Sequence, residues 1–397
     1  MAKYKGHSKI IRQLTSDLNV AKKDSTRVSG SLKVFPPLYM LQDFKISVLE
    51  FININKLEKV IHPESFGDII KSSFIKHKGN ENSIINDADE FIEKEKKNEE
   101  TTFIVTTEVQ GGNLEEDLVT FGKFYITNGK KTKQFLTEKT SIVIDKMGDV
   151  DNKIIDEKIY ISLLVVAKSW KLAFEIGKIQ LEEFEYIFRL ILGTNTNLDL
   201  GIYNFLGTEV SQHIVSGRGF SNFYGEHLQR NTIDIRLNDT FFERPGFTKL
   251  FELISKEERS ELENKIIKSG VWVGKALKER NVNVATPEVV FGMETLLGNQ
   301  SRNFINPSIT FTVSSLAAFI YSDDYNERIK CKKIVNDFYS LRSSIVHGKG
   351  AIVSMKDIMD CINIIRKIIF NLVEDGKFVD MKTYKDLDEW YKVKLMS

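Results

Sequence analysis

Two residue types that can act on a phosphodiester lie close together near the C-terminus. Arg342 and His347 stand five positions apart in the stretch FYSLRSSIVHGKG, residues 338–350, among apolar and small residues. Histidine has a pKa of about 6.5 and exchanges protons at neutral pH, while arginine carries a permanent forked cation that matches phosphate oxygens. The pair therefore indicates acid–base chemistry on phosphate. The same spacing also fits an ordinary helix end, where a histidine is a favourable cation.

The element that must position this pair is a helix. The segment DDYNERIKCKKIVNDFYSLRSSIVH predicts one long helix that Gly348 can terminate. Residues five apart on an ideal helix are separated by about 140° around the axis and ~7.5 Å along it. One straight helix therefore cannot aim both side chains at one phosphate. Either the helix ends or distorts before His347, or the site is shared between two chains.

The surrounding segment, residues 246–397, is predicted to be an all-α helical bundle. Ser255-Lys256-Glu257-Glu258 has the pattern of a capping box, and Thr286-Pro287-Glu288 combines a cap, a first-turn proline and a first-turn acid. Ser354 is expected to cap the last long helix, whose apolar residues recur at three- and four-residue steps. Short connections between such helices predict an antiparallel bundle.

Residues 1–245 predict a mixed, β-rich domain, so the fold class of the whole chain is α+β. TTFIVTTEV (101–109) and EKIYISLLVVA are strand-like, and QLEEFEYIFRLIL (180–192) predicts an amphipathic helix. Asn128-Gly129 favours a hairpin turn. The charge-dense stretch at residues 80–100 is interpreted as an insertion, either an exposed helix or a mobile loop.

The amino-acid composition narrows the possible classes of function but does not identify one. A chain of 397 residues is long enough for two or three domains, and its net charge of +1 gives no bulk argument for or against a nucleic-acid partner. The two cysteines are too few for a disulfide framework and wrongly spaced for zinc, so we expect no metal and no cofactor. The absence of a signal peptide and of long apolar runs predicts a cytoplasmic protein without a membrane partner.

The stretch FYSLRSSIVHG resembles the active-site motif of the HEPN superfamily, in particular its ApeA-like branch, and the resemblance covers about residues 250 to 390. It implies a metal-independent endoribonuclease that cleaves single-stranded or loop RNA and leaves 2′,3′-cyclic phosphate and 5′-hydroxyl ends. It also implies a homodimer with a composite cleft in which Arg342 and His347 are catalytic. The biology implied is bacterial antiphage defence by abortive infection, with residues 1–245 as a sensor of an unknown trigger.

Three further residues are candidates for supporting roles in that resemblance. Ser343 would orient the phosphate or His347, or is a neutral helix-end serine; Glu294 would hold Arg342 by a salt bridge, or faces solvent. Tyr339 lies on the same helix face as Arg342 and either stacks on a base or, as we favour, packs in the interface. The rival hypothesis is a catalytically silent HEPN module that dimerises or binds a partner. An open basic cleft around Arg342 and His347, or their burial in salt bridges, would discriminate the two.

Overall fold

The computed structural model describes residues 4–25, 42–109, 112–140, 154–193, 210–217, 220–227, 235–237, 246–279, 281–298, 309–347 and 353–396. The chain divides into two compact units. The first comprises Met1–Val105, Leu164–Gly177 and Val215–Ser221, and the second Thr106–Leu163, Lys178–Ile214 and Asn222–Ser397. The two units are described separately below.

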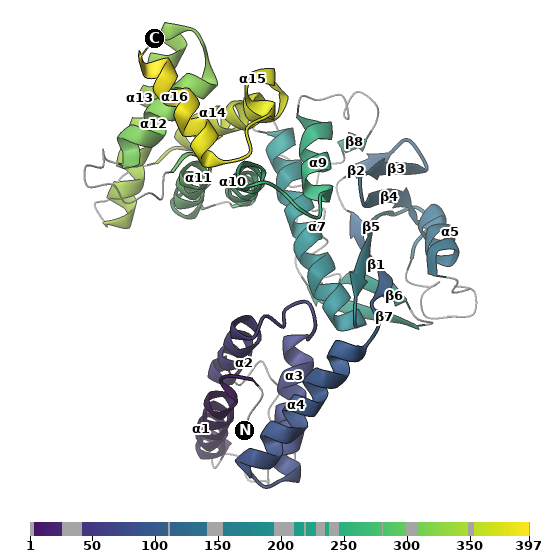
Figure 1. The fold of residues 1–397 in the computed structure, drawn as a ribbon. Helices are drawn as coiled ribbons and strands as arrows, with labels where there is room; N and C mark the ends of the chain where they lie inside the picture. The colour runs from purple at the N-terminus through teal and green to yellow at the C-terminus, as the bar shows by residue number, and fades with distance from the viewer. Residues whose placement is uncertain are drawn as a thin grey trace. The chain divides into compact units, whose positions relative to one another are not determined.

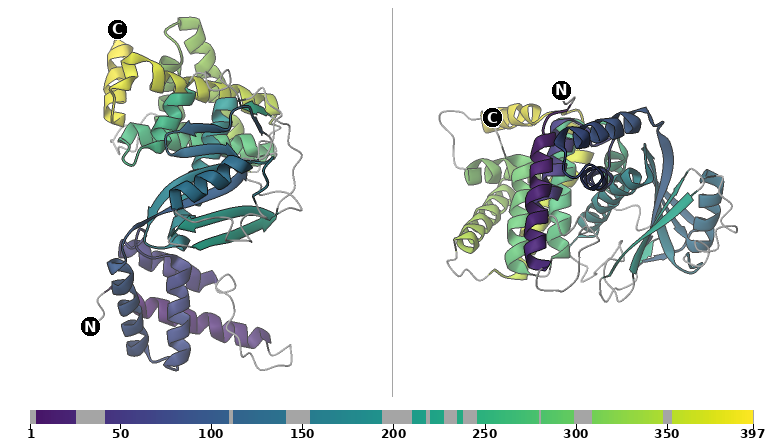
Figure 2. Two further views of the ribbon diagram at one scale, coloured as in Figure 1. Left: turned by 90° about the vertical axis from the view of Figure 1, so that its right-hand side faces the viewer. Right: turned by 90° about the horizontal axis from the view of Figure 1, so that it is seen from below.

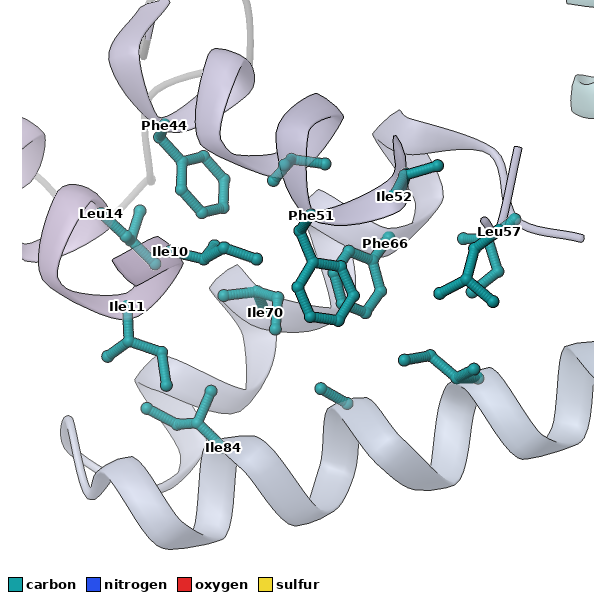
Figure 3. Packing of buried hydrophobic residues seen from close by; sticks show 14 residues of the cluster. Ile10, Ile11, Leu14, Phe44, Phe51, Ile52, Leu57, Phe66, Ile70 and Ile84 are labelled. Atoms are coloured by element: carbon teal, nitrogen blue, oxygen red, sulfur yellow. The ribbon is translucent and has the colours of Figure 1, made fainter. Parts of the chain in front are cut away.

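The first unit is built mainly from four helices at the start of the chain (Figure 1): α1 (His7–Ser25), α2 (Gln42–Ile54), α3 (Pro63–Lys76) and α4 (Glu81–Lys97). Their apolar residues form one core, seen in Figure 3, in which the Phe51 and Phe66 rings stack at a centroid distance of 5.0 Å. The prediction of a β-rich N-terminal half is therefore wrong for the first hundred residues. Helical periodicity in these short segments was not recognised.

The charge-dense stretch at residues 80–100 is helix α4. Ile84, Ala88 and Ile92 recur every four residues and are fully buried, while the charged residues occupy the other faces. The Asn80 side chain accepts a hydrogen bond from the Ser83 backbone N–H and caps the helix. A helix was one of the two alternatives, but this helix contributes to the core and is not an insertion.

The strands confirm the mixed α+β class. A six-stranded sheet has the order β3-β4-β5-β1-β6-β7, and β2 pairs with β8 in a small parallel sheet. The strands are β1 (Thr101–Val109), β2 (Gly112–Leu114), β3 (Leu118–Phe121), β4 (Phe124–Asn128), β5 (Ile159–Ala167), β6 (Val210–Gly217), β7 (Phe220–His227) and β8 (Ile235–Leu237). The predicted strands at 101–109 and around 159–167 are both confirmed.

The predicted hairpin at Asn128-Gly129 is wrong. Strand β4 ends at Asn128, whose side chain accepts a hydrogen bond from the Lys131 N–H at 2.8 Å and starts helix α5 (Gly129–Thr140). The hairpin turn lies instead between β3 and β4, where Gly122 has a φ of +55°. An added Cβ at Gly122 would lie 2.1 Å from the Ser255 Oγ, so the turn also requires a glycine for space.

Helices cover both faces of this sheet in the second unit (Figures 1 and 2). Adjacent residues of β4 point to opposite faces. Phe124 packs on Phe184 of α7 (Trp170–Leu192) at 4.8 Å, and Tyr125 packs on Phe135 of α5 at 4.7 Å. The predicted helix at 180–192 is thus confirmed as the second half of α7.

All described residues after 245 lie in helices or their connections. The helices are α9 (Phe247–Ser255), α10 (Glu261–Lys278), α11 (Val282–Leu297), α12 (Ile309–Tyr321), α13 (Tyr325–Val346), α14 (Met355–Glu374), α15 (Gly376–Val379) and α16 (Tyr384–Met396). Ser354 caps α14 as predicted. The other two starts were misplaced, because Ser260 and Glu263 form the capping box of α10 and Asn281 caps α11.

Glycines on α10 allow α7 to pack closely against this helical segment. An added Cβ at Gly270 would lie 2.5 Å from Ile187, and one at Gly274 would lie 2.3 Å from the Tyr186 carbonyl oxygen. The helices after 245 thus share a compact unit with α7 from Lys178 onward and with much of the sheet, and a domain boundary at 245 stays a prediction. Among the described residues, no helix is long and apolar enough to cross a membrane.

Candidate functional site

Helix α13 and its C-cap residue include four of the five candidate residues. The Asp324 side chain caps its N-terminus by accepting a hydrogen bond from the Glu327 N–H at 2.9 Å. Its buried side is marked by Cys331, Val335, Phe338 and Tyr339, at steps of four, three and one. Arg342 follows Tyr339 by three residues and is half-buried, so it lies toward this inner side.

The helix ends at Val346, and His347 is its C-cap residue. The His347 N–H still donates to the Ser343 carbonyl at 3.1 Å, an i to i−4 hydrogen bond that keeps His347 on the helical path. Its side chain is exposed, as is that of Ser343. The helix end therefore does not turn His347 toward Arg342, and the two side chains diverge by about 140° in one chain.

Glu294 of α11 lies close to Tyr339 and Arg342. Tyr339 is only 8% exposed. Burial raises the pKa of its hydroxyl far above the ordinary value, the Glu294 carboxylate raises that pKa further, and the Arg342 cation opposes the rise. The structure thus brings Glu294 of α11 and Arg342 of α13 close to Tyr339.

Arg342 lacks the partner that was expected for it. Among the described residues it forms no ion pair within 4.0 Å, with Glu294 or any other acid, and its Nε is buried without a hydrogen-bond acceptor. A buried N–H left unpaired costs on the order of 1–3 kcal/mol. The Nε–H of Arg342 is therefore a donor that no described residue uses.

The lysines near the motif are mostly engaged elsewhere. Lys330 pairs with Glu327 at 3.0 Å, and the Lys332 ammonium lies 4.4 Å above the centre of the Phe311 ring. Lys333 is exposed. Gly348 and Lys349 lie outside the described residues. These lysines do not converge on Arg342.

Sequence reasoning missed an exposed stripe along α13. We call it the outer stripe; its members recur at steps of four, seven, four, three and four residues and are Tyr325, Ile329, Asn336, Ser340, Ser343 and His347. Asn336 is half-buried, and the other five are exposed. Tyr325 is 67% exposed and Ile329 is 50% exposed. These residues precede His347 at the three- and four-residue steps of one helix face, or at the sum of two such steps, so the spacing could have been found in the sequence.

The described residues contain no group of three or more His, Cys, Asp or Glu side chains placed to hold a metal ion. Cys331 and Cys361 are both buried and free, and burial raises the pKa of each thiol. Comparison with family models, with curated proteins and with solved structures finds no match for the chain. The HEPN resemblance consequently rests on the FYSLRSSIVHG motif and on the residues around it.

Proposed function

We propose that this chain is a metal-independent endoribonuclease of HEPN type, acting as a homodimer with Arg342 and His347 as its catalytic residues. One observation carries the proposal: the motif arginine has an unsatisfied Nε and no ion pair among the described residues, while the motif histidine is exposed one residue beyond the same helix.

RNA supplies its own nucleophile in this reaction. The 2′-oxygen attacks the neighbouring phosphorus as a base removes its proton, and the bond to the 5′-oxygen breaks as an acid protonates that oxygen. His347 of one chain and His347 of the second copy divide these two roles. Arg342 stabilises the negative charge of the pentavalent phosphorane. The products are a 2′,3′-cyclic phosphate and a 5′-hydroxyl.

The divergence of the two side chains supports a shared site. Since Arg342 and His347 are about 140° apart on α13, one chain cannot direct both at one phosphate. A twofold axis beside the end of α13 places the Arg342 of one copy opposite the His347 of the other. Nearer the start of α13, Tyr325 and Ile329 of the outer stripe present exposed apolar area that a second copy would also cover.

The biological setting proposed is bacterial antiphage defence by abortive infection, and it rests on the resemblance alone. A dimer that cuts RNA freely would damage its own cell, so the enzyme needs a restraint. We assign that restraint to the N-terminal part of the chain, whose four-helix unit is the candidate sensor. A cytoplasmic location accords with this setting.

The test is incubation of the purified chain with total RNA in EDTA, beside Arg342→Ala and His347→Ala. We expect fragments with cyclic-phosphate ends from the wild type and none from either variant. Lys385→Ala is the matched control, because Lys385 is an exposed cation on α16 that pairs with Glu389 at 3.5 Å and has no assigned role. Light scattering on the same samples reports the dimer.

If the wild-type chain forms a stable dimer but the RNA stays intact, two explanations remain: an enzyme that is latent without its trigger, or the catalytically silent module. Deleting residues 1–245 would strip α7 from α10 and is a poor way to separate them. Expression in bacteria is better, because a triggered nuclease slows growth and the His347→Ala variant does not. Equal growth of the wild-type and His347→Ala strains during phage challenge would contradict the nuclease proposal.

A further inference from the structure

The outer face of helix α10 combines lysines with aromatic rings. Lys268, Trp272 and Lys275 are spaced by four and three residues, so they share one side of the helix. Trp272 packs on Phe291 of the neighbouring helix α11 with a centroid distance of 5.3 Å, and Phe291 is 37% exposed. We call these four residues the α10–α11 face.

The two lysines of this face are not neutralised by contact with an acid. Among the described residues, neither Lys268 nor Lys275 has a carboxylate within 4.0 Å. Lys268 is exposed. The Lys275 ammonium lies 4.8 Å from the centre of the Trp272 ring and 5.6 Å from that of Tyr186 on α7, so aromatic faces hold its position.

An alternation of unpaired cations and aromatic rings matches single-stranded nucleic acid. Its bases expose flat faces that stack on aromatic side chains, and its phosphates lie at regular intervals along the backbone. A duplex hides its base faces, so its bases could not stack on these rings. The charge and the flat rings therefore favour a single strand as the occupant.

The face also leads to the candidate site. Phe291 and Glu294 are three residues apart on α11, and Glu294 lies beside Tyr339 and Arg342. Phe291 and Glu294 are about 4.5 Å apart along the axis of α11, so a strand stacked on Phe291 would lie next to the residue that contacts the Arg342 cluster. Glu288, one turn before Phe291, and Glu182 of α7 both interact electrostatically with Lys275, so each would oppose a phosphate here; neither makes an ion pair with Lys275 within 4.0 Å.

We infer that the α10–α11 face binds single-stranded RNA, with Phe291 and Trp272 stacking bases and Lys268 and Lys275 contacting phosphates. The choice of RNA rests on the proposed ribonuclease function. The face is a binding surface that delivers the strand to Arg342, and none of its four residues takes part in bond cleavage.

The test uses a strand that cannot be cleaved. A labelled 2′-O-methyl oligonucleotide of about 12 nucleotides, within the usual range of single-strand sites, lacks the attacking hydroxyl. Binding to the full chain is measured by fluorescence anisotropy at several salt concentrations. Phe291→Leu keeps apolar volume and removes the ring, and we expect about tenfold weaker binding. Lys268→Ala with Lys275→Ala should reduce the salt slope by about 1.4, from about 0.7 per phosphate contact.

Two controls keep the test specific. Lys249→Ala with Lys392→Ala removes the same charge from exposed lysines of α9 and α16 that are ion-paired, and should leave the Kd unchanged. Glu288→Gln should tighten binding, because it removes one of the two opposing acids. Circular dichroism verifies that every variant is folded.

The outcomes separate this inference from the ribonuclease proposal. Weaker binding by the Phe291 and lysine variants, with the controls unchanged, supports the face even if the chain never cleaves RNA. Equal binding by wild type and variants overturns it even if His347-dependent cleavage is found. Failure of the wild type to bind the oligonucleotide, or equally tight binding of a duplex, also overturns it.

Discussion

Replacing Arg342 by methionine tests whether the arginine is kept for stability or for function. Methionine has a similar length and no polar hydrogen, so it removes a buried Nε that has no acceptor. The desolvation cost of such a group is on the order of 1–3 kcal/mol. The half-buried side chain loses some favourable interaction with the Glu294 charge, which offsets part of the gain. We expect a net stabilisation of about 1 kcal/mol, or roughly 2 °C in the melting midpoint.

The rate of RNA cleavage by Arg342→Met, in contrast, should fall. Loss of a cation that stabilises the phosphorane costs about 100- to 1,000-fold in rate by analogy with removal of an oxyanion donor. Scanning calorimetry and the EDTA cleavage assay on the same preparation measure both quantities. Lys330→Met is the matched control, since Lys330 is exposed and paired with Glu327; it should change neither. A clear loss of stability in Arg342→Met with cleavage retained would refute the reasoning.

Three further predictions concern assembly, pH and packing. Ile329→Lys places charge on the outer stripe and should halve the mass by light scattering. A 1:1 mixture of wild-type and His347→Ala chains should give about a quarter of wild-type cleavage, because only a quarter of the dimers keep both histidines. An unchanged mass, or cleavage at half the wild-type rate, contradicts the shared site. Burial lowers the pKa of His7, so the folded unit prefers the neutral ring and its stability should fall as pH drops below about 6.5. Hydrogen exchange at pH 7.5 and 5.5 should show this loss of stability, and His7→Gln should make the stability less dependent on pH. Gly274→Ala should cost about 1–3 kcal/mol by chemical denaturation because its Cβ would meet Tyr186, whereas Gly376→Ala, with open space around it, should cost much less.

Local periodicity was sufficient for the longest elements. The apolar repeat of α14 has the spacing of a buried helix face, and strand β1 is a run of β-branched residues with the bounds that the sequence indicated. The errors fell where one short signal fits two structures. Asn128-Gly129 suits a hairpin, yet Asn128 caps a helix, because asparagine serves both turns and caps.

The misplaced helix starts have a related cause. Ser255 and Ser260 each precede glutamates at suitable spacing, and only Ser260 completes a capping box with Glu263. Ser255 instead ends α9, where its hydroxyl donates to the Phe251 carbonyl at 2.8 Å. The packing of Phe251 on Phe184 and Phe247 extends α9 to this point, and no local pattern reports that packing.

The sequence by itself determined the candidate chemistry: an arginine and a histidine five residues apart on one helix, with a tyrosine three residues before the arginine. Helix geometry also determined that the pair diverges, since 100° per residue leaves them about 140° apart. Only the tertiary structure decided which of them faces inward. Packing of α11 against α13 brings Glu294 to Tyr339 and leaves the Arg342 Nε buried without an acceptor, because such contacts join residues more than forty positions apart.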